Sequence, residues 1–221
     1  MLKKRLQQYM WKTYRRKHID SLLSTHEHLF SGVVLDIGGR DRGKFKKPKE
    51  QVKKWIFADI NPAHNPDIVL DVSCMDTIEN SSVDTILACE LFEHVQQIDE
   101  GIIECFRVLK QHGRMIISVP FLYAIHADPS DYQRWTKYKW IQELEKNGFH
   151  VEECIITGRF FTLMAEYTKI LFKSLPQPLS FGVLFLCPFL DLLVRLDRLP
   201  LIKNHPRLGN FHGGYFIVVT K

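Results

Sequence analysis

An apolar run that stops at two glycines is the feature of this chain that most restricts its fold. Residues 33–39 read VVLDIGG, and a second apolar run ends in Asp59 about twenty residues later. A buried strand that ends at a turn tolerated only by glycine lets a ligand approach the main chain closely. An acidic side chain at the tip of the next strand is placed to accept hydrogen bonds from a ribose. The two runs therefore predict a site for a nucleotide-type cofactor.

Apolar strands and helical patterns alternate along the rest of the chain. Strands are expected at 32–36, 54–59, 67–71, 82–89, 113–119 and 149–156, with a seventh over 213–219. Helical spacing covers 98–109, where Gly113 is expected to end the helical region, and 137–147, where Gly148 stops the helix. This alternation indicates an α/β fold with a doubly wound, seven-stranded, mostly parallel sheet that ends in a terminal hairpin.

Length and hydrophobic content limit how the chain is organised. With 221 residues and 45% hydrophobic content, it can bury one substantial core. We expect an amphipathic helical segment at 1–30 and one domain over 31–221, with a hydrophobic helical insertion at about 160–201. The five cysteines are far apart and form no CxxC pair, which predicts reduced core residues in a cytoplasmic protein.

The net charge of +5 is unevenly distributed. One basic cluster occupies residues 3–17 and another occupies residues 44–54. Such clusters suit phosphates, acidic lipids or nucleic acid, and a solvated surface explains them equally well. Because aromatic residues are not interleaved with the basic runs and no zinc-finger spacing is present, we do not expect nucleic acid as a partner.

Three further segments extend the first two motifs into an ordered set. Residues 66–71 read PDIVLD, residues 83–95 read VDTILACELFEHV, and residues 104–113 read ECFRVLKQHG. Together with LDIGG and Asp59, they resemble the class I S-adenosylmethionine-dependent methyltransferases of the small-molecule type. The resemblance covers roughly 30–160 and 213–221. It implies a Rossmann-like methyltransferase fold with S-adenosyl-L-methionine as the cofactor.

The resemblance also implies which residues contact that cofactor. Those around its methionine part are Asp36, Gly38, Gly39 and Arg40. Those at the ribose and adenine are Asp59, Ile60, Asp71 and Val72, and those beside the sulfonium are Cys89, Glu90 and Leu91. Arg40 departs from the family pattern, because it stands where further glycines are usual. Either an arginine holds the cofactor carboxylate there, which we favour, or the site has lost activity.

The segment after the fifth strand is expected to serve the methyl acceptor. Residues 118–136 read SVPFLYAIHADPSDYQRWT and lie at the carboxyl edge of the sheet, where ligands of open α/β folds bind. Histidine accepts protons near neutral pH, so His126 is the expected general base for O-methylation. The residues expected to bind the acceptor are His94, Phe121, Asp128, Asp131, Tyr132 and Arg134. An ion pair that pins the loop explains Asp131 and Arg134 at least as well, and packing explains His94.

Several alternatives remain open at this stage. No metal is expected, because the histidines form no HExxH pattern and lack a convincing third ligand. The 118–136 segment also resembles, more weakly, methyltransferases associated with bacterial cell-surface polysaccharide synthesis, which implies a sugar or lipid-linked glycan as acceptor. A non-catalytic binding module on the same scaffold is a second interpretation. A nicotinamide oxidoreductase is a third, against which the missing GxGxxG counts.

The apolar insertion at about 160–201 has two interpretations. Its densest part, residues 179–194, is interrupted by Gly182, Pro188 and Asp191. A membrane-spanning helix needs about twenty predominantly apolar residues, so we expect this run to fall short. It could form a lid over the acceptor pocket or the interface of a homodimer. Alternatively, it could lie in the inner face of the membrane with basic residues near the headgroups, which would make the enzyme peripheral.

Overall fold

The computed structural model describes residues 12–39 and 45–221, which form two compact units. The sheet unit comprises residues 20–155 and 215–221, and the helical unit comprises residues 156–214 together with the chain up to residue 19. The amphipathic segment expected at 1–30 is thus shared between the units. Its first eleven residues lie outside the described part of the chain.

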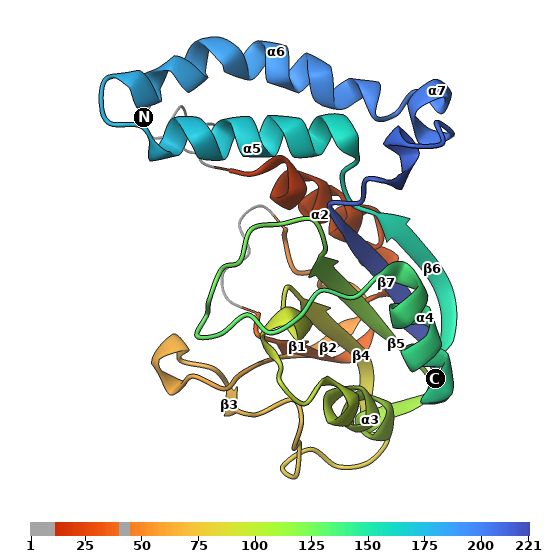
Figure 1. Ribbon diagram of the computed structural model, residues 1–221. Helices are drawn as coiled ribbons and strands as arrows, with labels where there is room; N and C mark the ends of the chain where they lie inside the picture. Colours follow the sequence, from red (N-terminus) through yellow and green to blue (C-terminus); the bar gives the residue numbers. More distant parts are fainter. Residues whose placement is uncertain (1–11, 40–44) are drawn as a thin grey trace. The chain divides into compact units, whose positions relative to one another are not determined.

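The sheet has seven strands in the order β3-β2-β1-β4-β5-β7-β6 (Figure 1). In chain order they are β1 (Gly32–Ile37), β2 (Val52–Asp59), β3 (Ile68–Val69), β4 (Val83–Cys89), β5 (Leu109–Pro120), β6 (His150–Ile156) and β7 (Gly214–Thr220). The chain thus steps outward from β1 to β3, returns to β4 on the other side of β1 and continues to β5. It then forms the edge strand β6, and β7 lies between β5 and β6. This order confirms the predicted doubly wound, Rossmann-like sheet.

The centre of the sheet is parallel and buried. β1 pairs with both β2 and β4, so that Asp36 lies in register with Phe57 on one side and Leu87 on the other. The last four residues of β1 and the last five of β4 are buried. Strands covered on both faces read as nearly continuous apolar runs, which is why the sequence revealed them.

The last strand runs antiparallel to its neighbour β5. The His112 N–H donates to the Lys221 carbonyl over 2.9 Å, and the Lys221 N–H donates to the Gly113 carbonyl over 3.0 Å, so the start of β5 meets the end of the chain. The predicted terminal hairpin is confirmed. The expected role of Gly113 was wrong: α3 ends at Val108, and β5 begins at once. Residues 110–113 instead form an irregularity in β5, because Val83 pairs with Leu109 while Thr85 pairs with Arg114.

Three helices belong wholly or in part to the sheet unit: α2 (Tyr14–Thr25), α3 (Ile98–Val108) and α4 (Lys137–Lys146). The end of α4 lies close to α3, since the ring of Phe106 on α3 meets edge to face the ring of Phe149, three residues beyond α4, with centroids 5.1 Å apart. Gly148 follows α4 with φ +91°, and a Cβ there would lie 2.9 Å from the Phe106 ring. Only glycine fits this turn, which confirms the predicted end of the helix.

Both units also contain short 3₁₀ helices. They are η1 (Glu27–Leu29), η2 (Pro62–His64) and η3 (Phe92–His94) in the sheet unit, and η4 (Leu179–Phe181) and η5 (Leu208–Asn210) in the helical unit. None of residues 45–51 is helical, and residues 40–44 are not described. The connection from β1 to β2 therefore has no helix among its described residues.

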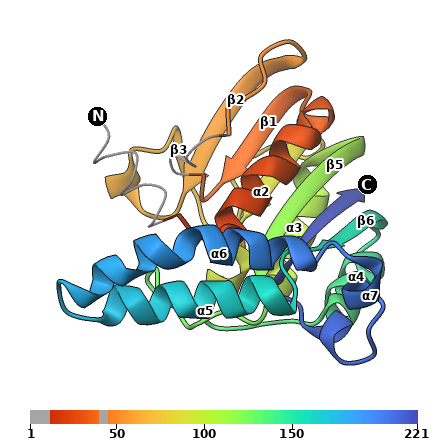
Figure 2. The same cartoon turned by 90° about the horizontal axis from the view of Figure 1, so that it is seen from above.

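The helical unit is built on a hairpin of α5 (Phe160–Ser174) and α6 (Gly182–Leu196), followed by the short α7 (Pro200–Lys203). Figure 2 shows α5 and α6 side by side. At the hairpin's base, the Asp197 carboxylate accepts N–H groups from Arg159, Phe161 and Thr162 over 2.8–3.1 Å. An acceptor at this position satisfies the first amides of α5, which have no partner within the helix.

Main-chain hydrogen bonds hold the two ends of this hairpin together at residues 157–158 and 213–214, which we call the neck. The Thr157 N–H donates to the Gly214 carbonyl over 2.9 Å, and the Gly213 N–H donates to the Gly158 carbonyl over 2.8 Å. These two bonds continue the β6–β7 pairing beyond the strands. About fifty-five residues therefore leave and re-enter the fold between two neighbouring strands.

The apolar segment of this hairpin is longer than the sequence predicted. The helix continues through Pro188, and residues 179–196 have a mean hydropathy of 2.0, with only 17% of them buried. By length and composition alone, this segment could cross a membrane, whereas we expected it to fall short. A core helix of a soluble protein can pass the same test, so the finding alone is weak evidence of a membrane span.

Candidate functional site

The turn after β1 lies against the end of β4. Gly38 has φ +68°, and its N–H donates to the Ala58 carbonyl of β2 over 2.7 Å. A Cβ on Gly38 would lie 3.2 Å from Leu91, which follows β4. A Cβ on Gly39 would lie 2.1 Å from the Asp36 carboxylate. Both glycines are therefore required by close approach, and the carboxyl ends of β1, β2 and β4 meet here as the sequence predicted.

Asp36 is held inward at this turn. Its side chain is buried, and the Trp55 indole N–H of β2 donates to its Oδ2 over 3.1 Å. The carboxylate therefore braces β1, the glycine turn and β2 against one another. Trp55 was not among the expected site residues. Its contact with Asp36 depends on strand pairing, which the sequence does not display.

Asp59 stands at the tip of β2 with its carboxylate already engaged. Its Oδ1 accepts the Asn61 N–H over 2.9 Å, and the His64 Nδ1 lies 3.0 Å from its Oδ2. Ile60 beside it is exposed. A ribose bound here would share this carboxylate with the His64 imidazole, a residue that the family resemblance did not indicate.

The end of β4 carries a strained main-chain conformation. Glu90 has φ +55°, in the left-handed region that non-glycine residues rarely adopt. Two hydrogen bonds from β5 hold it: the Glu90 N–H donates to the Ser118 carbonyl over 2.7 Å, and the Ser118 hydroxyl donates to Glu90 Oε1 over 2.8 Å. Such conformations concentrate at functional sites. Cys89, directly before Glu90, is buried.

Asp71 and Val72 lie further along the same edge. Asp71 is exposed, and its Oδ1 accepts both the N–H and the hydroxyl of Ser73, over 2.9 and 2.7 Å. Val72 is buried, and its side chain lies against Gly101 of α3. The Val72 side chain thus belongs to the core. A ligand at this edge would meet Val72 only through its main-chain atoms. Arg40 lies outside the described residues.

The loop over residues 121–136 is tied to η3. The Tyr132 N–H donates to the Glu93 carbonyl over 2.8 Å, and the Gln133 amide donates to the Val95 carbonyl over 2.7 Å. The His94 Nδ1 lies 2.6 Å from the Ser130 carbonyl. His94 therefore bridges the two segments and does more than pack. These contacts bring residues of the loop beside the end of β4.

An ion pair fixes the shape of this loop. The Asp131 carboxylate accepts hydrogen bonds from both terminal nitrogens of Arg134, one of them 2.6 Å long. It also accepts the main-chain N–H of His126 over 2.9 Å. The Asp131 side chain is almost fully buried. Hydrogen bonds from Arg134 hold the pKa of Asp131 at about 2. The ion pair that we had considered for these two residues is present.

His126 is half-buried between two other rings. The His94 and Tyr123 rings meet it edge to face, with centroids 5.2 and 5.3 Å away. Its Nδ1 lies 3.1 Å from the Ala124 carbonyl, and its Nε2 lies 3.9 Å from Glu93 Oε1. Glu93, which is only 2% exposed, was not an expected site residue. The contact between Glu93 and His126 spans more than thirty residues of sequence. The motif EHV by itself therefore did not predict it.

The remaining expected acceptor residues are less closely grouped. Phe121 lies against Tyr215 of β7, with ring centroids 5.7 Å apart. Asp128 and Tyr132 are exposed. The structure therefore brings together His94, His126 and Asp131 with Arg134, while it leaves Asp128 and Tyr132 on the loop surface.

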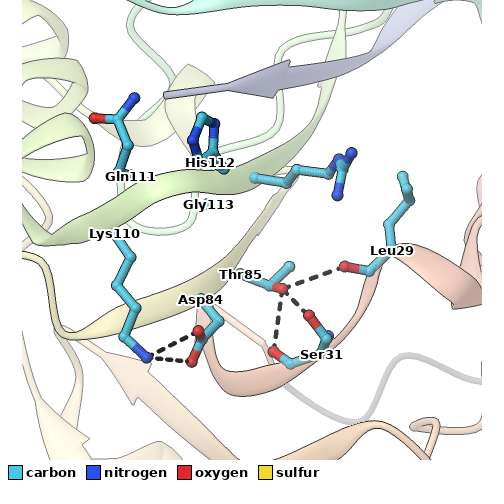
Figure 3. A pocket seen from close by; sticks show the side chains of 9 residues that line it. Leu29, Ser31, Asp84, Thr85, Lys110, Gln111, His112 and Gly113 are labelled. Atoms are coloured by element: carbon cyan, nitrogen blue, oxygen red, sulfur yellow. Dashed lines mark hydrogen bonds and ion pairs between the residues drawn. The ribbon is translucent and has the colours of Figure 1, made fainter.

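A small polar cavity of about 100 Å³ lies at the opposite edge of the sheet, where β1, β4 and β5 begin (Figure 3). The Lys110 ammonium bonds both oxygens of Asp84 at 2.8 Å, and Asp84 also accepts the Val33 N–H. The Thr85 hydroxyl bonds to Ser31 and Leu29. No expected site residue lines this cavity, and its polar groups serve to join the strand ends.

We predict that Asp131→Ala lowers the free energy of unfolding by about 3 kcal/mol at pH 7, because it leaves Arg134 without its buried carboxylate. A carboxylate with a lowered pKa stabilises the fold above its ordinary pKa, and this contribution is lost as the pH falls from about 4 toward 2. The difference between the two proteins in denaturant unfolding should shrink over that range. The control is Glu152→Gln, which removes a partly exposed partner of Arg114 and should cost about 1 kcal/mol or less. Equal losses in both variants would contradict the prediction.

Comparison with known proteins agrees with this geometry. A methyltransferase domain family model matches residues 46–117, and no curated protein sequence matches the chain. A S-adenosylmethionine-dependent methyltransferase from Archaeoglobus fulgidus has a TM-score of 0.61 at 18% identity, covering 93% of this chain and 94% of that one.

Two further structures show how widely the fold is used. Phosphoethanolamine N-methyltransferase 2 of Haemonchus contortus, solved with S-adenosyl-L-methionine, gives a TM-score of 0.56 at 15% identity, over 91% of this chain and 52% of that one. The [4+2]-cyclase SpnF has a TM-score of 0.58 at 13% identity, covering 92% of this chain and 79% of that one. S-Adenosylmethionine is the cofactor that these findings support. Residues 46–117 thus match a methyltransferase domain model, and the chain as a whole has the fold of S-adenosylmethionine-dependent methyltransferases.

Proposed function

We propose that this protein transfers a methyl group from S-adenosylmethionine to a hydroxyl of a small molecule or sugar. The observation that supports this best is the position of His126, which stands beside the end of β4 with one ring nitrogen facing Glu93. The cofactor site would comprise the glycine turn after β1, Asp59, and the strained end of β4. The acceptor would enter over the 121–136 loop.

The hydrogen bonds around His126 indicate which nitrogen accepts a proton. The Ala124 carbonyl near Nδ1 can only accept a hydrogen bond, so Nδ1 carries the hydrogen and Nε2 keeps its lone pair. Asp131 takes the His126 N–H and fixes the backbone there. The Glu93 carboxylate, 3.9 Å from Nε2, stabilises the positively charged ring that proton transfer would form.

The reaction needs little more from the protein. When bound, the cofactor supplies an activated methyl group, whose bond to sulfur breaks as the bond to the acceptor oxygen forms. His126 Nε2 would take the hydroxyl proton, and the products are a methyl ether and S-adenosylhomocysteine. The chain's main task is to align the acceptor with the methyl group and to exclude water.

Cofactor binding is tested by calorimetry with S-adenosylhomocysteine. We expect the unaltered chain to bind it and Asp59→Ala to bind at least tenfold more weakly, because the ribose hydroxyls would lose a charged acceptor. Glu145→Ala, which removes an exposed carboxylate from α4, is the control and should bind normally. No binding by the unaltered chain would favour a non-catalytic module.

Proton transfer is tested by measuring the release of S-adenosylhomocysteine with two kinds of methyl acceptor. One is a hexose glycoside, and the other is the matched glycoside in which an amino group replaces one hydroxyl. We expect turnover with the hydroxyl acceptors and a loss of roughly 10²- to 10⁴-fold in His126→Ala, with unchanged binding of S-adenosylhomocysteine. His150→Ala, an exposed histidine on β6, is the control. Transfer only to the amino group, or full activity in His126→Ala, would refute the assignment.

We also propose that the helical unit binds the acidic inner surface of a membrane, where a lipid-linked glycan would be the acceptor. Its described residues include eleven lysines and arginines and only three acidic residues. Their net charge is therefore +8, compared with +5 for the whole chain. Phe181, Phe185, Phe189 and Leu192 are exposed at helical spacing along η4 and α6, and Phe185 is 86% exposed. An exposed apolar stripe on a basic helical hairpin suits an anionic lipid surface.

This membrane proposal is tested by flotation of the full chain with vesicles. We expect it to float with phosphatidylglycerol-containing vesicles, less so at high salt, and hardly with pure phosphatidylcholine. Phe185→Asp should abolish flotation, whereas Ile103→Asp, which alters an apolar residue 52% exposed on α3, should not. Absence of flotation would overturn the proposal. A dimer in sedimentation that Phe185→Asp dissociates would favour a subunit interface instead.

A further inference from the structure

Three side chains around His126 offer donor atoms that face one another. Glu93 Oε1 lies 3.8 Å from His94 Nε2 and 3.9 Å from His126 Nε2. One donor atom from each residue lies within 4.8 Å of the others. We propose that Glu93, His94 and His126 bind one divalent transition-metal ion. No metal was expected from the sequence, because Glu93 and His94 come from η3 and His126 from a loop more than thirty residues away.

Both imidazoles are oriented for this role by main-chain carbonyls. The Ser130 carbonyl lies 2.6 Å from His94 Nδ1, and the Ala124 carbonyl lies 3.1 Å from His126 Nδ1. Each carbonyl requires the hydrogen to be on Nδ1, so each Nε2 presents a lone pair toward Glu93. Metal-binding histidines almost always donate their other ring N–H in this way, which fixes the tautomer and the direction of the ring.

The charge and geometry of the cluster also suit a cation. The Glu93 side chain is 1% exposed, so its carboxylate is stabilised by nearby positive charge more strongly than at the surface. Donors held about 2.1 Å from one ion lie roughly 3.0–3.6 Å apart, so small side-chain movements would close the site. Two imidazoles and one carboxylate favour zinc, iron, cobalt or nickel over magnesium and calcium, which prefer oxygen ligands.

Metal binding would compete with the proposed chemistry. The His126 Nε2 lone pair can receive a proton or hold a metal, and it cannot do both. A bound ion would therefore slow methyl transfer, a consequence that rests on the proposed function. The metal site itself does not depend on that function and is tested without an acceptor.

The test is a titration of the full chain, freed of metal by a chelator, with Co²⁺ and with Zn²⁺ in competition with a chromophoric chelator. We expect one ion per chain and a Co²⁺ absorption band. Glu93→Gln and His94→Ala should each weaken binding by roughly tenfold or more. His150→Ala is the histidine control, and Cys74→Ser removes an exposed thiol that could bind zinc elsewhere.

Folding is checked in each variant by circular dichroism and denaturant unfolding of the metal-free protein, and binding of S-adenosylhomocysteine is measured separately, so that failure of the cofactor site is distinguished from failure of the metal site. Only millimolar binding by the unaltered chain would overturn the proposal. Binding that survives in both Glu93→Gln and His94→Ala, or that disappears in Cys74→Ser, would overturn it as well.

Discussion

Parallel pairing of β1 with β2 on one side and β4 on the other is the constraint on which the rest of this structure depends. Because the three strands run in the same direction and pair in regular register from Val34 onward, their carboxyl ends meet at one edge. The glycine turn, Asp59 and Glu90 are brought together by this geometry alone.

A second layer of polar contacts holds the functional edge in shape. The Trp55 indole braces Asp36, Ser118 braces Glu90, and Arg134 braces Asp131. Each pair joins a residue near the site to another strand or to its own loop. A site supported in this way can keep a strained residue such as Glu90, because its neighbours fix the conformation from more than one side.

Sequence reasoning recovered what depends on local pattern. Continuous apolar runs marked the strands, and Gly148 marked the end of α4, because burial and positive φ impose residue types directly. It failed where partners distant in sequence decide the outcome. Gly113 looked like a helix end, yet pairing of β5 with the chain's last strand placed it in a strand. Pro188 looked like an interruption, yet α6 continues through it.

The candidate site shows the same division. Asp131 and Arg134 are three residues apart, so an ion pair between them could be expected from spacing alone. Trp55, His64 and Glu93 could not be assigned from spacing, because their contacts arise from strand register or from the docking of the 121–136 loop on η3. The glycine turn and Asp59 were recognised because the cofactor's chemistry restricts those positions most tightly.

The neck at residues 157–158 and 213–214 has a consequence for how this chain can change. Since the main chain crosses it as two hydrogen-bonded segments, residues 159–212 form one long hairpin loop in the connection between β6 and β7. The entropy of closing a loop rises only slowly with its length, by about 0.6 kcal/mol for each doubling. Evolution could therefore lengthen, shorten or replace the helical hairpin at little cost to the sheet. The hairpin can thus vary in length and composition while the strands that carry the carboxyl edge of the sheet keep their order.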